Sequence, residues 1–491
     1  MSTNDKKRQS GAGPLEIFWA VVPKVPLILK VILLHLLGRS ESAQYLDLRS
    51  DVTISFLRSL LSPAKPRSVS EVQDMTLRDP GVKGKMWVST MASQVPPEEG
   101  IRDALFAAID AMSGPEQKGA PPLAVPDIVP VEAEWTGYRA GATRDSKPPA
   151  IPEEEKYREL MKECTSSTTI LYLHGGAYYL CDPATHRPFV AKLAKLTGGR
   201  AYSVRYRLAP QHPFPAALLD ALVSYFTLLY PPPGSAHEAV APADLVITGD
   251  SAGGNLCMAL LQLLLELRRQ DRKVAWFGAE REVPLPAAVT PMSPWVDLVQ
   301  TMPSLTDNGR WDYLPPPRLL SRDRGHQPPA DGLWPADPPR RHVYVADAYM
   351  LHPLGSLHLA RSWAGAPPVY LCCGWETLQD EDRYLASRLA RDGVAVVFEE
   401  FQAMPHVFAA MLPQSAEARR CVDGLTNFIK AACEDPGKIV PSYKMVKAKT
   451  LEEVDIDVDQ LTSFTDADVR DMARNMVSEQ QSPFPDVPAK I

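Results

Sequence analysis

The sequence has few cysteines, no glycosylation acceptor and no basic excess, and each shortage argues against a class of protein. Its seven cysteines are an odd number without zinc-like spacing, so they are interpreted as core thiols in a reducing compartment. No Asn-x-Ser/Thr acceptor occurs, which removes one expected sign of a secreted protein. A net charge of −7 offers no basic field to a polyanion, and we therefore expect no nucleic-acid partner.

An uninterrupted membrane-spanning run is also missing. Residues 17–37 are long enough to cross a bilayer, but Lys24, Lys30 and His35 interrupt them and two prolines stand near their start. On a helix Lys24 and His35 fall on nearly the same side, with Lys30 about 120° away. This pattern favours a helix that lies in the membrane interface with its lysines reaching water.

The basic residues Lys6, Lys7 and Arg8 just upstream would suit anionic headgroups. We therefore predict that residues 1–40 associate with a membrane surface. The alternative is an apolar helix that covers the folded domain instead. No small-residue cleavage site indicates a removable signal peptide.

The remaining chain is long and apolar enough to bury a large core, since 45% of the 491 residues are hydrophobic. Residues 41–115 have mainly helical patterns, with a short extended piece around Trp87, and we interpret them as a cap. Residues 116–435 are predicted to form the main folded domain, because strand and helix patterns alternate along most of them. Such alternation predicts an α/β fold with a mostly parallel sheet flanked by helices.

Two further segments differ in composition from this domain. Residues 315–339 are too rich in proline for a helix or strand and are predicted to be a surface loop or flexible insertion. Residues 436–491 form an acidic tail with one predicted helix after Thr465, which would act as its N-cap.

The strand pattern Leu-Val-Ile-Thr-Gly-Asp is followed directly by Ser251 and then by a strongly apolar helix pattern. Gly249-Asp250-Ser251-Ala252-Gly253 thus has the form GxSxG with a strand before it and a helix after it, which is the context of a nucleophile elbow. A serine hydroxyl needs a base to take its proton. The motif therefore predicts a histidine and an acid further along the chain.

Both partners occur in the expected order. His406 stands shortly after a predicted strand and before a helix, and Glu376 is the first carboxylate past the strand Pro-Pro-Val-Tyr-Leu-Cys-Cys-Gly-Trp. Asp380 and Asp382 come where a helix should already be forming, so we interpret them as a solvated helix face. The order Ser251, Glu376, His406 is that of α/β-hydrolase triads.

These motifs resemble the hormone-sensitive-lipase-like α/β-hydrolases, the group that includes arylacetamide and sterol deacetylases. The six matching blocks are His174-Gly175-Gly176, Tyr206 to Pro210 with His212 to Ala217, Gly249 to Gly254, Ser293 to Leu298, Glu376 to Glu381, and His406. The resemblance implies an α/β-hydrolase fold, here with the N-terminal helical cap described above. Two residues depart from the family pattern. Ala177 replaces a usual third glycine, which matters only if the position needs positive φ, and Glu376 replaces a frequent aspartate.

The two glycines after the strand Thr-Thr-Ile-Leu-Tyr-Leu expose backbone N–H groups where open α/β sheets bind ligands. We predict that the N–H groups of Gly175, Gly176 and Ala252 form the oxyanion hole. Tyr178 and Tyr179 are expected to line or support the substrate site, and an equally weighted alternative makes them core aromatics.

The predicted function is serine hydrolysis of carboxylic esters through an acyl-enzyme, with no metal and no organic cofactor. The resemblance implies lipophilic substrates such as sterol acetates or short to medium acyl esters. With the apolar amino terminus, it also suggests the endoplasmic reticulum or a lipid droplet as location, with the cytosol as the alternative.

Two alternative functions stay open at this point. One is a non-catalytic ligand receptor on a hydrolase scaffold, although plant hormone receptors of this type have lost the histidine that this chain keeps in His406. The other is an amidase or formamidase that uses the same triad.

Overall fold

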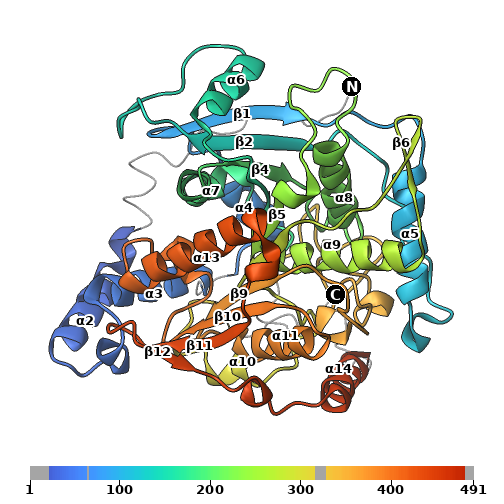
Figure 1. The fold of residues 1–491 in the computed structure, drawn as a ribbon. Coiled ribbons are helices and arrows are strands. Elements are labelled where there is room, and N and C mark those ends of the chain that lie inside the picture. The colour runs from blue at the N-terminus through green and yellow to red at the C-terminus, as the bar shows by residue number, and fades with distance from the viewer. Residues whose placement is uncertain (1–20, 63–65, 316–327, 482–491) are drawn as a thin grey trace.

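A ten-stranded sheet organises the computed structural model, which describes residues 21–62, 66–315 and 328–481 (Figure 1). The strand order is β1-β2-β4-β3-β5-β8-β9-β10-β11-β12. The strands are β1 Met86–Ala92, β2 Glu132–Tyr138, β3 Thr169–Leu173, β4 Arg200–Arg205, β5 Leu245–Asp250, β8 Ala288–Met292, β9 Val369–Gly374, β10 Val396–Phe401, β11 Ser442–Val446 and β12 Glu453–Asp455. A separate hairpin pairs β6 Val274–Trp276 with β7 Ala279–Arg281.

The sheet is mostly parallel, as predicted. The seven neighbouring strands β4, β3, β5, β8, β9, β10 and β11 run parallel to one another. Toward the two edges, β1 pairs antiparallel with β2, β2 with β4, and β12 with β11. The central strands β3, β5 and β9 lie at the three strand patterns named above, and β10 is the strand predicted shortly before His406. The predicted α/β fold with a mostly parallel sheet is therefore confirmed.

Helices cover both faces of the sheet. They are α2 Val25–Leu36, α3 Leu48–Leu61, α4 Val69–Thr76, α5 Gly100–Met112, α6 Glu153–Glu163, α7 Pro183–Thr197, α8 Ala216–Leu229, α9 Ala252–Arg269, α10 Ser304–Asp307, α11 Gln379–Arg391, α12 Phe408–Met411, α13 Ala416–Glu434 and α14 Asp466–Gln481. Alternate residues of β3 enter different cores, because side chains of a strand alternate between faces. Leu171 and Leu173 pack with α8 and α9, and Ile170 and Tyr172 pack with α7 and α13.

The domain boundaries differ from the sequence prediction at both ends of the sheet. The extended piece around Trp87 is the edge strand β1, which pairs with β2, so this part of the predicted cap belongs to the main sheet. In the tail, β11 and β12 extend the opposite edge, and α14 begins directly after Thr465 as predicted. Within residues 315–339, the described positions form neither helix nor strand, and 316–327 lie outside the described residues.

The amino-terminal helices form a hairpin at the periphery of the molecule, with α3 between α2 and the rest of the fold (Figure 1). The α3 side chain Ile54 joins the core on the α7 and α13 side of the sheet. None of the α2 residues is buried. Of the helices in the described part of the chain, none has both the length and the apolar character needed to cross a bilayer.

Candidate active site

Ser251 occupies a sharp turn between β5 and α9. Its backbone has φ 55° and ψ −123°, a combination that non-glycine residues rarely adopt and that is typically retained at functional sites. The turn is possible because the flanking residues are small. A Cβ on Gly253 would collide with the carbonyl oxygen of Leu173 on β3. The predicted strand, serine and helix are thus present, with the serine at the carboxyl end of a central strand.

The end of β8 links Ser251 to the other two predicted residues. The Ser251 N–H donates to the carbonyl of Met292, at 3.0 Å. The next residue, Ser293, donates its hydroxyl to Glu376 Oε2 at 2.6 Å and accepts the N–H of Val407 at 3.2 Å. The loops that carry the acid and the base therefore meet beside the turn that carries Ser251.

Glu376 and His406 contact each other directly. His406 Nδ1 lies 2.7 Å from Glu376 Oε1, and both side chains are buried. This contact leaves Nε2 as the nitrogen that can exchange a proton with a serine. Burial alone would lower the pKa of His406, but the charge and hydrogen bond of Glu376, with Asp312 and Asp250 nearby, raise this pKa above its usual value.

The other two carboxylates of this region lie elsewhere and need a partial correction. Asp380 accepts the N–H of Ser304 at 2.9 Å. Asp382 does not lie on a solvated face as predicted, because it is fully buried and neither of its oxygens has a hydrogen-bond partner in the described structure. Burial, together with neighbouring acids, raises the pKa of Asp382 well above its usual value.

The loop after β3 requires a revision of the predicted oxyanion donors. The Gly175 N–H donates to Asp250 Oδ1 at 3.2 Å and is therefore already used. Among the described residues, no acceptor is found for the N–H groups of Gly176, Ala177 and Ala252. Ala177 has φ 50°, so the position where the family usually has glycine does adopt the left-handed conformation.

Asp250 holds this loop against the Ser251 turn. Its carboxylate accepts the Tyr172 hydroxyl at 2.7 Å in addition to the Gly175 N–H, and His186 Nε2 lies 3.4 Å away. His174 is not available for proton transfer, because burial lowers its pKa to about 4 and its ring stacks on Tyr206. The histidine of the His-Gly-Gly sequence is thus structural.

The two tyrosines differ in their surroundings. Tyr178 is fully buried, donates its hydroxyl to Asn255 and stacks on Tyr344 with ring centroids 3.6 Å apart. It therefore matches the core alternative. Tyr179 is partly exposed, and its carbonyl accepts a hydrogen bond from Gln73 of α4.

Three polar residues that organise the site, Asp250, Ser293 and Asp312, were not singled out from the sequence. Two of them lie inside quoted motifs, Asp250 before the serine and Ser293 at the start of Ser293-Pro294-Trp295, so their proximity to the site could have been inferred. Asp312 lies in no motif. Within the described ranges, no group of three or more His, Cys, Asp or Glu side chains is arranged to hold a metal ion.

Comparison with known proteins yields a consistent set of similarities. Residues 170–410 match the family model of the alpha/beta hydrolase fold. An acetyl-hydrolase of Streptomyces hygroscopicus is 31% identical over 265 residues, which cover 54% of this chain and 76% of that protein. A carboxylesterase/phospholipase, LipF, of Mycobacterium tuberculosis is 28% identical over 268 residues, covering 54% of this chain and 62% of that protein.

Solved structures show the same kind of similarity. A crystal structure of an esterase from the bacterial hormone-sensitive lipase family has 24% identity and a TM-score of 0.46, and the match covers 68% of this chain and 99% of that one. The family model and the acetyl-hydrolase show that the chain is an α/β hydrolase, similar in sequence to acetyl-hydrolases and carboxylesterases. It belongs to the α/β-hydrolase family, together with this acetyl-hydrolase.

Proposed function

We propose that the protein is a carboxylic ester hydrolase in which Ser251, His406 and Glu376 form the catalytic triad. The observation that carries the proposal is the buried 2.7 Å contact between His406 Nδ1 and Glu376, in loops joined through Ser293 to the end of β8 beside Ser251. This arrangement orients an imidazole and compensates its positive charge, as a serine nucleophile requires.

The proposed reaction has two steps. His406 Nε2 removes the Ser251 proton while the serine oxygen attacks the ester carbonyl, and the N–H groups of Gly176, Ala177 and Ala252 stabilise the oxyanion. The alcohol leaves with the proton that His406 returns. Water activated by His406 then hydrolyses the acyl-enzyme and releases the acid.

We further propose acetylated or short to medium acyl lipophilic esters, of which sterol acetates are one example, as the substrate class. The relative named acetyl-hydrolase supports the short acyl group. The exposed apolar helix α2 supports a substrate with a lipophilic alcohol group. Such a helix would hold the enzyme at a membrane surface, and lipophilic esters partition into membranes.

A panel of acetyl, butyryl and octanoyl esters beside their matched amides, with sterol acetates included, tests this proposal, and the Ser251→Ala protein serves as blank. The expected result is ester cleavage that falls by about a millionfold in the variant while its fold is retained. Equal cleavage by wild type and Ser251→Ala would remove Ser251 from its role. Faster turnover of the amides would favour an amidase instead.

Membrane attachment through α2 is a separate part of the proposal. Leu29, Leu33 and Leu36 form a stripe on one side of the helix and are 58–70% exposed. Lys24 donates to the carbonyl of Ser59 and His35 contacts Asp51, so these two polar side chains face α3, not water. A stripe of this kind fits a lipid surface. The basic cluster at residues 6–8 lies outside the described residues.

Flotation with vesicles tests this attachment. Exchanging the three leucines for glutamine should lower vesicle binding by about a hundredfold or more, because inserting each half-exposed leucine contributes roughly 1 kcal/mol. The control exchanges the exposed Val125 and Val440 for glutamine and should bind like wild type. Equal binding of all three proteins would contradict the proposal. A protein that lacks residues 1–40 should still cleave a soluble short-chain ester.

A further inference from the structure

One buried carboxylate, outside every motif of the sequence, connects the loop of the acid with the loop of the base. Asp312 Oδ1 accepts the backbone N–H of His406 at 3.2 Å. Asp312 Oδ2 accepts the N–H of Thr377 at 2.9 Å and its hydroxyl at 2.8 Å. Thr377 directly follows Glu376, so a single side chain fixes the backbone on both sides of the contact between Glu376 and His406.

The residue after Asp312 completes this connection. The hydroxyl of Tyr313 donates to the carbonyl of His406 at 2.7 Å, and the Tyr313 N–H donates back to Asp312 Oδ1 at 2.7 Å. Both backbone polar groups of His406 are therefore held by two consecutive residues of one loop. Tyr313 and Asp312 are themselves buried. The backbone that carries the imidazole thus has little freedom to move relative to Glu376.

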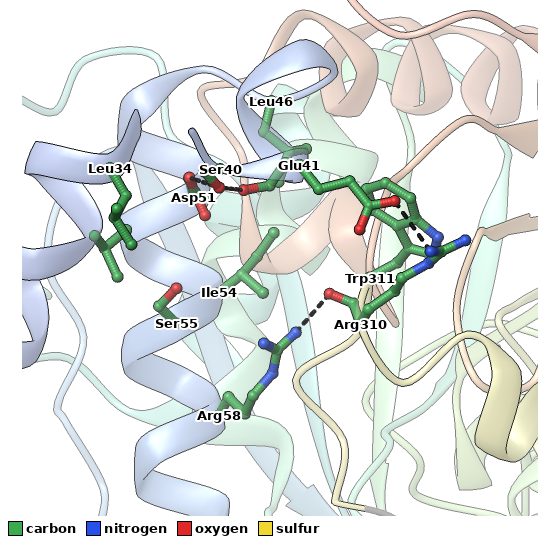
Figure 2. A pocket seen from close by; sticks show the side chains of 12 residues that line it. Leu34, Ser40, Glu41, Leu46, Asp51, Ile54, Ser55, Arg58, Arg310 and Trp311 are labelled. Atoms are coloured by element: carbon green, nitrogen blue, oxygen red, sulfur yellow. Dashed lines mark hydrogen bonds and ion pairs between the residues drawn. The ribbon is translucent and has the colours of Figure 1, made fainter. Parts of the chain in front are cut away.

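The loop that carries Asp312 is anchored in turn by the amino-terminal hairpin. Arg58 of α3 donates through Nε and Nη2 to the carbonyl of Asp312, at 2.9 and 2.6 Å, and through Nη2 to the carbonyl of Arg310, at 2.8 Å. Figure 2 shows Arg58 reaching from α3 to the backbone of this loop, at the edge of a cavity that Trp311 also lines. Trp311 packs against Trp375, which precedes Glu376.

An aspartate suits this position better than its amide would. Asp312 Oδ1 accepts the N–H groups of Tyr313 and His406, and Oδ2 accepts the N–H and the hydroxyl of Thr377. An asparagine has one acceptor oxygen, so its NH₂ would face one of the two sets and leave buried donors unpaired. Loss of the carboxylate should therefore loosen one of the two loops.

We propose that Asp312 is a positioning residue that aligns His406 with Glu376, and that Arg58 holds the loop of Asp312 in place. The inference rests on the proposed triad. Asp312 touches no reacting atom, and it acts through the backbone of the two loops. Its charge also acts on the imidazole, since Asp312 follows Glu376 among the groups that raise the pKa of His406.

The Asp312→Asn protein tests the inference, with Asp307→Asn as the matched control because Asp307 is exposed on the neighbouring helix α10. We expect a kcat about 10- to 100-fold lower in Asp312→Asn, since small misplacements of catalytic groups cost up to about a hundredfold. KM should change little, because Asp312 does not touch substrate. The acid limb of the kcat/KM profile should move to lower pH, because a negative charge near His406 is lost.

Rates are expressed per active site, counted by fluorophosphonate labelling, so that misfolded protein does not lower kcat. Should Asp312→Asn fail to fold, Tyr313→Phe and Thr377→Val each remove one hydroxyl of the network, and each should lower kcat by roughly threefold to tenfold. Arg58→Gln should also lower kcat.

A folded Asp312→Asn protein with the kcat and acid limb of the wild type would overturn the inference, as would unchanged kcat in both hydroxyl variants. Failure of the proposed triad gives a different result. In that case the Ser251→Ala protein would keep its activity, whatever Asp312→Asn does.

Discussion

Replacing Glu376 by glutamine changes the charge of the site while nearly preserving its shape, and the structure predicts how the new side chain will lie. Glu376 Oε2 accepts two hydrogen bonds, from the Ser293 hydroxyl at 2.6 Å and the Gly374 N–H at 3.0 Å. Oε1 accepts from His406. The single oxygen of glutamine should therefore turn toward Ser293 and Gly374, and its NH₂ should face His406.

An NH₂ group facing Nδ1 forces the imidazole into the wrong tautomer, in which Nε2 carries the proton and cannot serve as a base. The positive charge formed on His406 during attack is also no longer compensated. For a serine triad this change lowers kcat by about 10⁴-fold, equivalent to about 5.4 kcal/mol. The fold should survive, because the side-chain volume is kept.

The assay is steady-state hydrolysis of a soluble ester by Glu376→Gln, Asp380→Asn and Asp382→Asn, with circular dichroism to confirm folding. Asp380 and Asp382 do not contact His406, and burial raises the pKa of Asp382 well above its usual value, so both asparagine variants should stay within about tenfold of wild type. A loss in Asp380→Asn that exceeds the loss in Glu376→Gln would refute the placement of the acid.

Two other predictions follow from the backbone and charge of the site. Because His406 must be neutral to act as base and its pKa is raised, the acid limb of kcat/KM should lie above the usual histidine value of about 6.5; a pH profile of kcat/KM with its limb below 6 would contradict the charge environment described. The Ala177→Gly change should raise the free energy of unfolding by about 1 kcal/mol, because alanine is strained at φ 50° and glycine is not. A urea unfolding midpoint that does not rise would count against this backbone strain.

Local sequence patterns were sufficient to predict the central strands of the sheet. The strands β3, β5 and β9 are buried along their whole length and each contains a run of apolar residues. The GxSxG motif marks the strand-to-helix turn at Ser251 through the small residues that the turn requires. The strands toward the two edges of the sheet were harder to predict. The strand β2 contains glutamates and a glycine, and β12 is only three residues long, so their pairing depends on neighbours that the sequence pattern does not show.

The candidate site was predictable only where a residue lies in a motif. Glu376 was placed from its position past β9, and its contact with His406 has the geometry which that placement implies. Three other features depend on contacts between segments distant in sequence. They are the hydrogen bond from the Gly175 N–H to Asp250, the burial of Asp382, and the hydrogen bonds of Asp312. Such contacts are set by how the loops pack, which no local pattern encodes.

Covalent labelling of the full chain by a fluorophosphonate, followed by mass spectrometry of its peptides, tests whether Ser251 is the nucleophile of an ester hydrolase. We expect one adduct per chain, on Ser251, with ester hydrolysis lost in proportion to labelling and no adduct on the Ser251→Ala protein. An adduct at another residue that abolishes activity, or full hydrolysis by a protein labelled at Ser251, would contradict it.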